Sequence, residues 1–179
     1  KPSGLLSIRD GYNSKLLNLS DLLISEYGRV WTVHRLDKET SGVIIFCRTP
    51  EAHKSLNMQF QERKNTKKYH AIISKCPPWE NALVCFPLRI NGDRSHHTII
   101  DYTSGKPAAT KFRVICSYSH CTIIQAEPLS GYTHQIRKHL SSIGLPILFD
   151  QLYGKKDYLN YPPLENSRLA LHAYSISFL

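Results

Sequence analysis

A lone carboxylate between cations is the first candidate for chemistry in this sequence. Asp37 lies in the run His34–Gly42, which leads into the apolar residues Val43–Phe46. The positive charges of Arg35 and Lys38 favour the ionised form of the aspartate. An ionised aspartate just before a strand can serve as a nucleophile, a base or an ion-pair partner. The alternative is an aspartate that only caps a loop, since such groups are often structural.

A cluster of positive charge precedes an aromatic candidate further along the chain. Four of the six residues in Arg63–Lys68 are cations, and Tyr69 opens the strand-like stretch that follows. One interpretation is a solvated basic loop. The other is an edge that follows nucleic-acid phosphates beside a ring that stacks on a base.

A third set of polar side chains lies in Gly131–Leu140, the run that opens a predicted helix. Ile136, Leu140 and Ile143 recur on one face of this helix, whereas His134 and Arg137 share a different face. A helix start rich in hydrogen-bond donors suits an anion such as an RNA phosphate. The alternative is a polar face in water.

The composition favours a folded domain that binds a polyanion. Of the 179 residues, 23 are Lys or Arg and 14 are Asp or Glu, which gives a net charge of +9 with neutral histidines. That excess suits nucleic acid better than a membrane surface, because no strongly basic amphipathic helix is visible. No apolar run reaches the roughly 18 residues that a membrane helix needs. Hydrophobic residues make up 41% of the chain, as in ordinary folded domains.

The cysteines and histidines argue against a metal site. The five cysteines are odd in number and contain no Cys-x-x-Cys pair. Cys47, Cys116 and Cys121 lie in apolar runs, where a thiol packs as a small hydrophobic group. His96 and His97 are adjacent, so they point in opposite directions in a strand. We therefore expect no metal, and a reducing, cytoplasmic location.

Helices and strands are predicted to alternate along a single domain that spans residues 1–179. Ser20 caps a short helix, Asp21–Tyr27, Thr49 caps a second, Pro50–Arg63, and Gly144 ends the third. The absence of a starting methionine and the apolar stretch at the end favour a piece of a longer chain, trimmed at both ends. The expected strands are Arg29–Val33, Val43–Arg48, Tyr69–Ile73, Ala82–Ile90, His96–Tyr102, Ala109–Tyr118, Cys121–Ala126, Leu145–Leu148 and Arg168–Ala173.

Short motifs follow one another along almost the whole chain. They are Lys1-Pro2-Ser3-Gly4, His34-Arg35-Leu36-Asp37-x-x-Thr40-Ser41-Gly42, Lys67-x-Tyr69-x-Ala71, Gly105-Lys106-Pro107-Ala108-x-Thr110, Thr133-His134-Gln135-Ile136-Arg137-x-His139-Leu140 and Leu171-His172-Ala173. In this order they resemble the pseudouridine synthases of the RluA type. The motifs around Asp37 and Arg137 are long enough to be specific by themselves.

The resemblance implies an α+β fold, a mixed and mainly antiparallel central sheet flanked by short helices, with an RNA-binding cleft across it. The implied reaction is isomerisation of uridine in RNA to pseudouridine, without a metal or an organic cofactor. By resemblance, Asp37 is the catalytic aspartate, Tyr69 the active-site tyrosine and Arg137 a candidate cation for the aspartate. The residues expected to bind the substrate are His34, Arg35, Thr40, Lys67, Lys68, Thr133, His134 and Gln135.

The chemistry of these residue types agrees with that reaction. Breaking a glycosidic bond develops positive charge on the sugar, which an ionised carboxylate stabilises or traps. Isomerisation needs no hydrolytic water, so one aspartate suffices. The uridine must leave its stack, and Tyr69 offers an aromatic platform and a hydroxyl that assists proton movement. Arg137 is expected to keep Asp37 ionised and aimed, and Arg35 to share that work or to hold a phosphate.

Two positions depart from the family pattern. Tyr132 stands where the family usually has the arginine of Gly-Arg-Thr. If that arginine is the main partner of Asp37, either Arg137 compensates for its loss or activity suffers. Phe149-Asp150 stands where the family has Gly-Asp, which alters the wall near the cleft. Neither change touches Asp37 or Tyr69, so we favour an active enzyme.

Three functions compete at this point. The first is an RNA uridine isomerase that acts on rRNA or tRNA as a monomer. The second is a catalytically impaired, RNA-binding relative on the same fold, which the Tyr132 departure motivates. The third is a hydrolase of N-glycosidic bonds, which would use the same aspartate but release free base.

Overall fold

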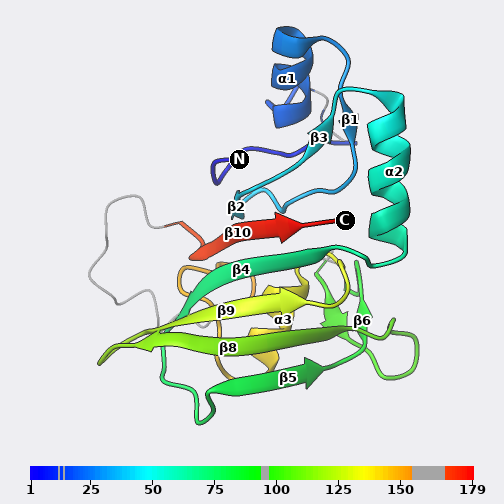
Figure 1. Ribbon diagram of the computed structural model, residues 1–179. Helices are drawn as coiled ribbons and strands as arrows, with labels where there is room; N and C mark the ends of the chain where they lie inside the picture. Colours follow the sequence, from blue (N-terminus) through cyan, green and yellow to red (C-terminus); the bar gives the residue numbers. More distant parts are fainter. Residues whose placement is uncertain (12, 14, 94–96, 155–167) are drawn as a thin grey trace. The chain divides into compact units, whose positions relative to one another are not determined.

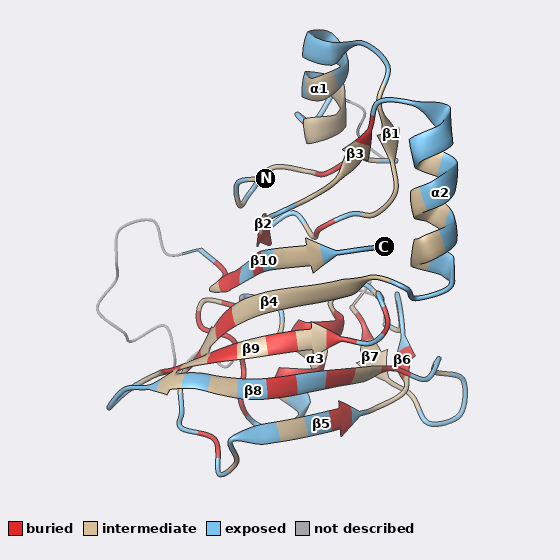
Figure 2. Ribbon diagram, in the orientation of Figure 1, coloured by how far each residue is buried: buried red, intermediate tan, exposed pale blue. Residues whose placement is uncertain are grey.

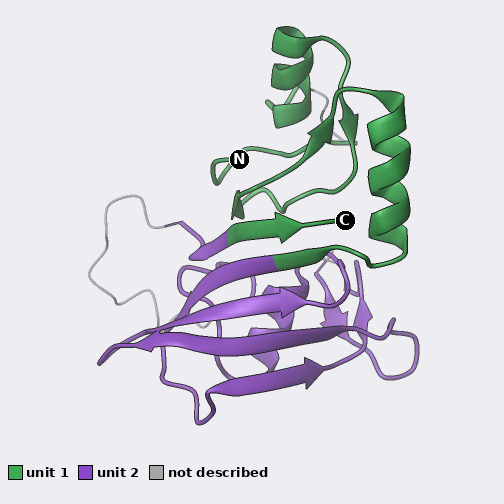
Figure 3. Cartoon of the chain, in the orientation of Figure 1, with its two compact units in different colours: residues 1–67, 173–179 green, residues 68–172 purple. Residues whose placement is uncertain are grey.

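The chain divides into two units by its internal contacts (Figure 3). The computed structural model describes residues 1–11, 13, 15–93, 97–154 and 168–179. Unit 1 comprises Lys1–Lys67 and Ala173–Leu179, and unit 2 comprises Lys68–His172. Two strands, β4 (Thr66–Ile73) and β10 (Leu171–Ser177), contribute residues to both units. Within the described ranges, no helix is long and apolar enough to cross a membrane.

Unit 1 is built from short strands and two helices (Figure 1). β1 pairs antiparallel with β3, with Trp31 opposite Cys47. β2 lies beside β10, where the Val43 N–H donates to the Ala173 carbonyl at 2.9 Å. The elements are α1 (Leu19–Tyr27), β1 (Trp31–Thr32), β2 (Ser41–Gly42), β3 (Phe46–Cys47) and α2 (Pro50–Gln61).

The ends of the two helices show how local side chains set their lengths. The Asn18 carbonyl oxygen Oδ1 accepts the Asp21 N–H at 2.9 Å, so α1 begins two residues before the predicted start and the Ser20 cap is wrong. Asn is as good an N-cap as Ser, which explains the shift. Gly28 ends α1 as predicted, with φ 74°.

The predicted cap of α2 is confirmed. Thr49 Oγ1 accepts the Ala52 N–H at 3.2 Å, and Pro50 occupies the first turn, where its missing N–H costs nothing. The helix ends at Gln61 instead of the expected Arg63, because Arg63 has φ 55° in the left-handed region.

Unit 2 contains four neighbouring strands of the larger sheet, with β4 included except for its first two residues. β4, β9, β8 and β5 lie side by side in that order, each antiparallel to its neighbour. Ala126 of β9 lies between two aromatic residues. It is opposite Tyr69 of β4 and opposite Phe112 of β8. The prediction of a mainly antiparallel sheet flanked by short helices is confirmed. The remaining elements are β5 (Asn81–Cys85), β6 (Leu88–Arg89), β7 (Ile99–Ile100), β8 (Ala109–Ser117), β9 (Thr122–Pro128) and α3 (Gln135–Ser142), with β6 and β7 forming a separate antiparallel pair.

The core of unit 2 lies between α3 and one face of this sheet. Along β8 and β9 buried and more exposed residues alternate, as the period of a strand requires (Figure 2). Ile136 and Leu140 of α3 join the buried side chains of the strands, as their spacing predicted. The buried strand residues of the cluster include Ala71, Ile73, Val84, Phe112, Ile124 and Ala126.

Several predicted strands are shorter or divided. The expected strand Ala82–Ile90 splits into β5 and β6 around Pro87, which lacks the N–H that a sheet ladder needs. Leu145–Leu148 forms only an isolated bridge, between Ile147 and Ile73. Of the expected strand His96–Tyr102, only β7 is formed, and His96 lies outside the described residues.

Candidate functional site

The segment at the start of the chain holds the loop that carries Asp37. The Ser7 hydroxyl donates to the Leu36 carbonyl at 2.8 Å and accepts the Leu36 N–H at 3.1 Å. The Gly4 N–H and the Lys1 ammonium each donate to the Lys38 carbonyl at 2.9 Å. The backbone on both sides of the half-buried Asp37 is therefore fixed within unit 1.

Lys1 also places positive charge near Asp37. Burial lowers the pKa of the side-chain ammonium of Lys1, while the negative charges of Glu39 and Asp37 raise it. The sequence had suggested Arg35 and Lys38 as the cations around the aspartate, and both are exposed. Reasoning from local spacing missed Lys1, because it lies 36 positions before Asp37.

The Thr40 hydroxyl is buried without a hydrogen-bond partner among the described residues. The side chain is only 2% exposed, and the Thr40 N–H closes a turn onto the Asp37 carbonyl at 3.1 Å. A buried hydroxyl that makes no hydrogen bond costs about 1–3 kcal/mol. The contact of Thr40 with substrate stays a prediction.

His34 makes contacts that stabilise unit 1. Its Nε2 accepts the Ile45 N–H at 2.9 Å, and its ring stacks on Phe60 with centroids 5.1 Å apart. Burial, followed by the positive charge of Lys67, lowers the pKa of His34 to about 4, so the ring is neutral at pH 7. These contacts give His34 a packing role, and its binding of substrate stays a prediction.

The two lysines expected to bind RNA together point in different directions. Lys67 and Lys68 are successive residues of β4, so their side chains project to opposite faces of the strand. Lys67 projects to the same face of β4 as Tyr69, because the two are separated by one residue. The Tyr69 ring packs against the buried cluster of unit 2. Burial, followed by the charge of Arg63, lowers the pKa of Lys67.

Two residues of the motif on α3 anchor the helix to the sheet. Gln135 is buried, and its amide accepts from Ser130 and the Tyr132 N–H and donates to the Ala109 carbonyl and Thr110. An amide group has two donors and two acceptor sites, so every one of them is occupied. Gln135 is thus a structural residue in unit 2, which leaves the predicted RNA contact without a free hydrogen-bonding group.

His139 has a comparable anchoring role. It is fully buried, with Nδ1 2.9 Å from the Thr110 hydroxyl and Nε2 3.2 Å from the Phe86 carbonyl. Since a carbonyl only accepts, Nε2 carries the proton and Nδ1 accepts from Thr110. Burial lowers the pKa of His139, which keeps the ring neutral.

Arg137 pairs with the carboxylate of Asp150, which directly follows the departure at Phe149. Arg137 Nε and Nη2 donate to Asp150 Oδ2 and Oδ1 at 2.8 and 2.7 Å, with side chains 3% and 1% exposed. Asp150 Oδ1 also accepts the Leu152 and Tyr153 N–H groups at 3.0 and 3.1 Å. This bidentate pair fixes the plane of the guanidinium.

Phe149, which stands in place of the family glycine, has φ 60° in the left-handed region. The glycine of the family pattern would adopt that conformation without strain, whereas a side chain costs about 1–2 kcal/mol there. The backbone at this position therefore adopts a conformation that suits glycine better than phenylalanine.

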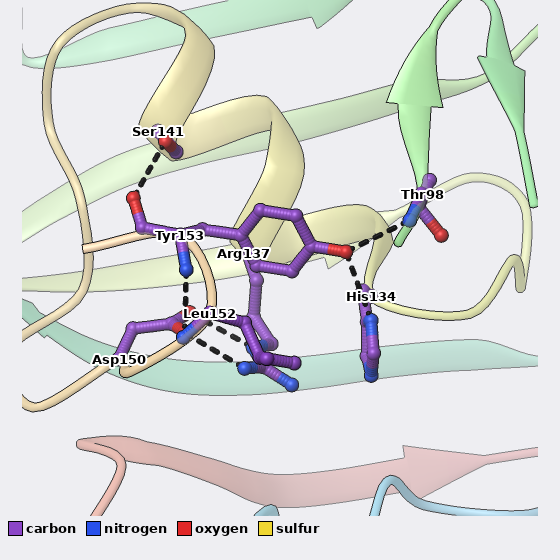
Figure 4. A network of polar contacts seen from close by, with 7 residues as sticks. All are labelled: Thr98, His134, Arg137, Ser141, Asp150, Leu152 and Tyr153. Atoms are coloured by element: carbon purple, nitrogen blue, oxygen red, sulfur yellow. Dashed lines mark hydrogen bonds and ion pairs between the residues drawn. The ribbon is translucent and has the colours of Figure 1, made fainter. Parts of the chain in front are cut away.

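His134, from the predicted substrate-binding set, directly precedes α3. Its backbone is in the left-handed region, with φ 56°. Its Nδ1 lies 3.0 Å from the Tyr153 hydroxyl, and that hydroxyl accepts the Thr98 N–H at 2.9 Å (Figure 4). The exposed Thr133 is held by its carbonyl, which accepts the Thr98 hydroxyl at 2.8 Å. No motif or spacing in the sequence had pointed to Thr98 or Tyr153.

The structure places the predicted catalytic residues in different units. Asp37 belongs to unit 1, and Tyr69 and Arg137 belong to unit 2. Their meeting in one site stays a prediction. In the part of the chain that the structure describes, no group of three or more His, Cys, Asp or Glu residues could hold a metal ion.

A hollow of about 460 Å³ lies over β5, β8 and β9. None of the predicted site residues lines it. Lys111 and Arg113 in its lining alternate along β8 with the core residue Phe112, so they project from the face of the sheet opposite α3. The residues around the hollow are Asn81, Ala82, Leu83, Lys111, Phe112, Arg113, Gln125 and Glu127.

The sequence matches a known family over most of its length. Residues 1–142 match the family described as RNA pseudouridylate synthase. The dual-specificity RNA pseudouridine synthase RluA of Salmonella typhi is 34% identical over 174 residues, which cover 97% of this chain and 78% of that protein. The ribosomal large subunit pseudouridine synthase C of Buchnera aphidicola is 35% identical over 183 residues, covering 99% of this chain and 58% of that protein.

Solved structures share the fold. Human RNA pseudouridylate synthase domain containing 4 matches with a TM-score of 0.78 at 24% identity, covering 99% of this chain and 78% of that one. Human RNA pseudouridylate synthase domain containing 1 matches with a TM-score of 0.75 at 26% identity, covering 89% of this chain and 68% of that one.

Proposed function

The chain belongs to the RluA family of RNA pseudouridine synthases, which are isomerases, and on that premise we propose that it converts specific uridines of rRNA or tRNA with Asp37 as the catalytic residue. The observation that carries the proposal is the fixed loop of Asp37. Hydrogen bonds to Leu36, Lys38 and Glu39 hold the backbone on both sides of the aspartate. A catalytic group needs such support, because small misplacement costs much of its rate.

The chemistry follows from one carboxylate and one rotating base. Cleavage of the bond between uracil N1 and ribose C1′ develops positive charge at C1′, which the Asp37 carboxylate stabilises or attacks. The freed uracil turns so that C5 bonds to C1′, and where Asp37 has attacked C1′, the bond between the two breaks in the same step. The proton on C5 leaves and N1 gains one, so the product is an isomer of the substrate.

The remaining roles come from the family motifs. We assign Tyr69 to stack on the everted uracil and to assist proton transfer through its hydroxyl. Arg137 is the cation that keeps Asp37 ionised, and the Thr40 hydroxyl and His134 contact the substrate. Arg35 holds RNA phosphate, since it is exposed and next to the catalytic loop. We further propose a monomer that works in the cytoplasm.

The decisive experiment uses RNA labelled with tritium at C5 of uridine. We expect the protein to release tritium and to leave pseudouridine on digestion. The Asp37→Asn variant should lose both, while its RNA affinity stays within a few-fold, because phosphate contacts carry most of the binding. Glu39→Gln is the matched control, an exposed carboxylate of the same loop that should keep full turnover.

The other outcomes identify the competing functions. Binding without chemistry would support the impaired relative that Tyr132 suggested, and free uracil would support a hydrolase. Equal turnover by wild type and Asp37→Asn would remove the aspartate from the mechanism.

A further inference from the structure

The turn from Asp101 to Lys106 carries an aromatic side chain that is 75% exposed, Tyr102. No other tyrosine, tryptophan or phenylalanine that the structure describes is exposed to this extent. A single exposed apolar group is ordinary on a protein surface, so its meaning depends on how it is held and on what surrounds it. At Tyr102 the backbone is fixed and cations are close in the fold.

The carboxylate of Asp101 holds the turn from inside. Its Oδ1 accepts the N–H groups of Thr103 and Ser104, both at 2.9 Å, and the Thr103 hydroxyl at 2.7 Å. Its Oδ2 forms an ion pair with Arg89 of β6, in which Nε is 2.7 Å away. The hydrogen bonds from Ser104 and Thr103 lower the pKa of Asp101 to about 2, so the carboxylate is ionised and keeps these partners at neutral pH.

The backbone at both ends of the turn is tied to β6 and to the residue before it. The Asp101 N–H donates to the Pro87 carbonyl at 3.1 Å, and Lys106 and Leu88 exchange two hydrogen bonds, both at 2.9 Å. Tyr102 is therefore an exposed ring on a fixed backbone. Such a group binds a ligand with little loss of conformational entropy, because only its two side-chain torsions remain to be ordered.

Two cations accompany the ring of Tyr102. The side chain of Arg89 is 47% exposed, and its five N–H donors are more than the pair with Asp101 can use, so donors remain for a ligand. Lys106 is exposed at the end of the turn. A nucleotide offers the complementary groups, a base that stacks on an aromatic ring and a phosphate that binds arginine or lysine. The net charge of +9 favours the same partner.

The turn lies within reach of the start of α3, where the proposed function places RNA. Thr98, which precedes β7, donates its N–H to the Tyr153 hydroxyl at 2.9 Å and its hydroxyl to the Thr133 carbonyl at 2.8 Å. Tyr102 follows Thr98 by four positions, which limits the distance between their Cα atoms to about 14 Å. One strand with stacked bases covers that distance with about four nucleotides. A single RNA molecule is therefore long enough to contact both places.

We propose that Tyr102 is a stacking platform for an unpaired nucleotide of the bound RNA, and that Arg89 and Lys106 bind the phosphates beside it. The proposal rests on the proposed function, because that function places the RNA at α3. The Asp101 turn serves to hold the ring ready for the base. Since a base inside a duplex is already stacked, this contact favours RNA that is single-stranded at the nucleotide it binds.

The test measures binding of a fluorescein-labelled oligocytidine about 12 nucleotides long by fluorescence anisotropy. This probe contains no uridine, so its binding does not depend on catalysis. Tyr102→Ala should raise Kd about 5-fold or more, because the stacking of one base is lost. Tyr102→Phe keeps the ring and should stay within about two-fold of wild type.

Salt dependence separates the ring from the cations. Tyr102→Ala should leave the slope of log Kd against log salt unchanged, since a ring releases no counterions, whereas Lys106→Gln should flatten it by about 0.7. Tyr118→Ala is the matched control, at an exposed tyrosine that follows β8, whereas Tyr102 precedes it. The length of that strand, about 25–30 Å, separates the two residues, so the control should leave Kd unchanged.

Three results would overturn the proposal. They are unchanged affinity in Tyr102→Ala, a loss in Tyr102→Phe as large as that in Tyr102→Ala, and no binding of the oligocytidine by the wild-type protein. Urea midpoints of the Tyr102 variants should equal that of wild type, because the side chain is exposed, so a loss of affinity reports on the contact itself. Failure of the proposed function is a distinct result, in which the wild-type protein releases no tritium from labelled uridine while the effect of Tyr102 on oligocytidine binding persists.

Discussion

Removing the carboxylate of Asp150 is expected to destabilise unit 2 by about 3–5 kcal/mol. Asp150→Ala leaves Arg137 as a charged group only 3% exposed, with two of its N–H donors unpaired. It also frees the Leu152 and Tyr153 N–H groups that the same carboxylate accepts. Because natural domains are stable by only about 5–15 kcal/mol, the loss is large enough to measure and small enough to leave a folded population.

The double variant distinguishes a lost ion pair from a lost side chain. Asp150→Ala combined with Arg137→Met buries no uncompensated charge, so it should be more stable than Asp150→Ala alone. The coupling energy from the cycle should reach at least about 2 kcal/mol, as for residues in direct contact. Glu127→Ala is the matched control in the same unit, because its partner Lys111 is 3.7 Å away and 58% exposed. A pair so exposed should contribute about 1 kcal/mol or less.

The assay is equilibrium urea unfolding followed by tryptophan fluorescence. The chain has two tryptophans, Trp31 in unit 1 and Trp79 in unit 2, so a Trp31→Phe background makes the signal report unit 2 alone. Trp79 packs against the buried cluster, which makes its emission sensitive to unfolding. A cost below about 1 kcal/mol for Asp150→Ala, or strict additivity in the cycle, would refute the reasoning.

Three further predictions address unit 1 and strand β4. His34 has a pKa of about 4 in the folded protein and one near 6.5 in the unfolded chain. Between these two values the unfolded state binds more protons, so the stability of the folded protein should fall as the pH drops from 6.5 to 4. Urea midpoints at pH 7, 6 and 5 should show a steeper decline for wild type than for His34→Gln, and parallel curves would contradict this. Gly42→Ala should lower the free energy of unfolding by more than about 2 kcal/mol, followed by the fluorescence of Trp31. The reason is that Gly42 has φ 122° and that an added Cβ would clash with the Ala173 backbone. A loss under about 0.5 kcal/mol would count against this prediction. Lys67→Ala should weaken RNA binding and flatten its salt dependence by about one phosphate contact, whereas Lys68→Ala, on the opposite face from Tyr69, should not; equal slopes for the two variants would show that the faces are not distinguished.

Local patterns in the sequence determined the elements and the family. Caps, prolines and glycines act within a few residues, so Thr49 and Gly28 mark helix ends that the structure confirms. The alternation of the strands and the spacing of Ile136 and Leu140 likewise follow from the period of the backbone. The shift of the cap from Ser20 to Asn18 shows the limit of such reasoning, because two residues that cap helices well lie only two positions apart.

Only the tertiary structure decided which polar groups meet. Lys1 near Asp37, Asp150 with Arg137, and Tyr153 with His134 join positions 36, 13 and 19 residues apart, across turns whose paths no local pattern specifies. The structure also shows that all four hydrogen-bonding positions of the Gln135 side-chain amide are occupied by groups of the protein. Residue type and spacing therefore suggested the chemistry. The path of the chain, set by burial and by the pairing of distant polar groups, showed which motif residues hold the fold together.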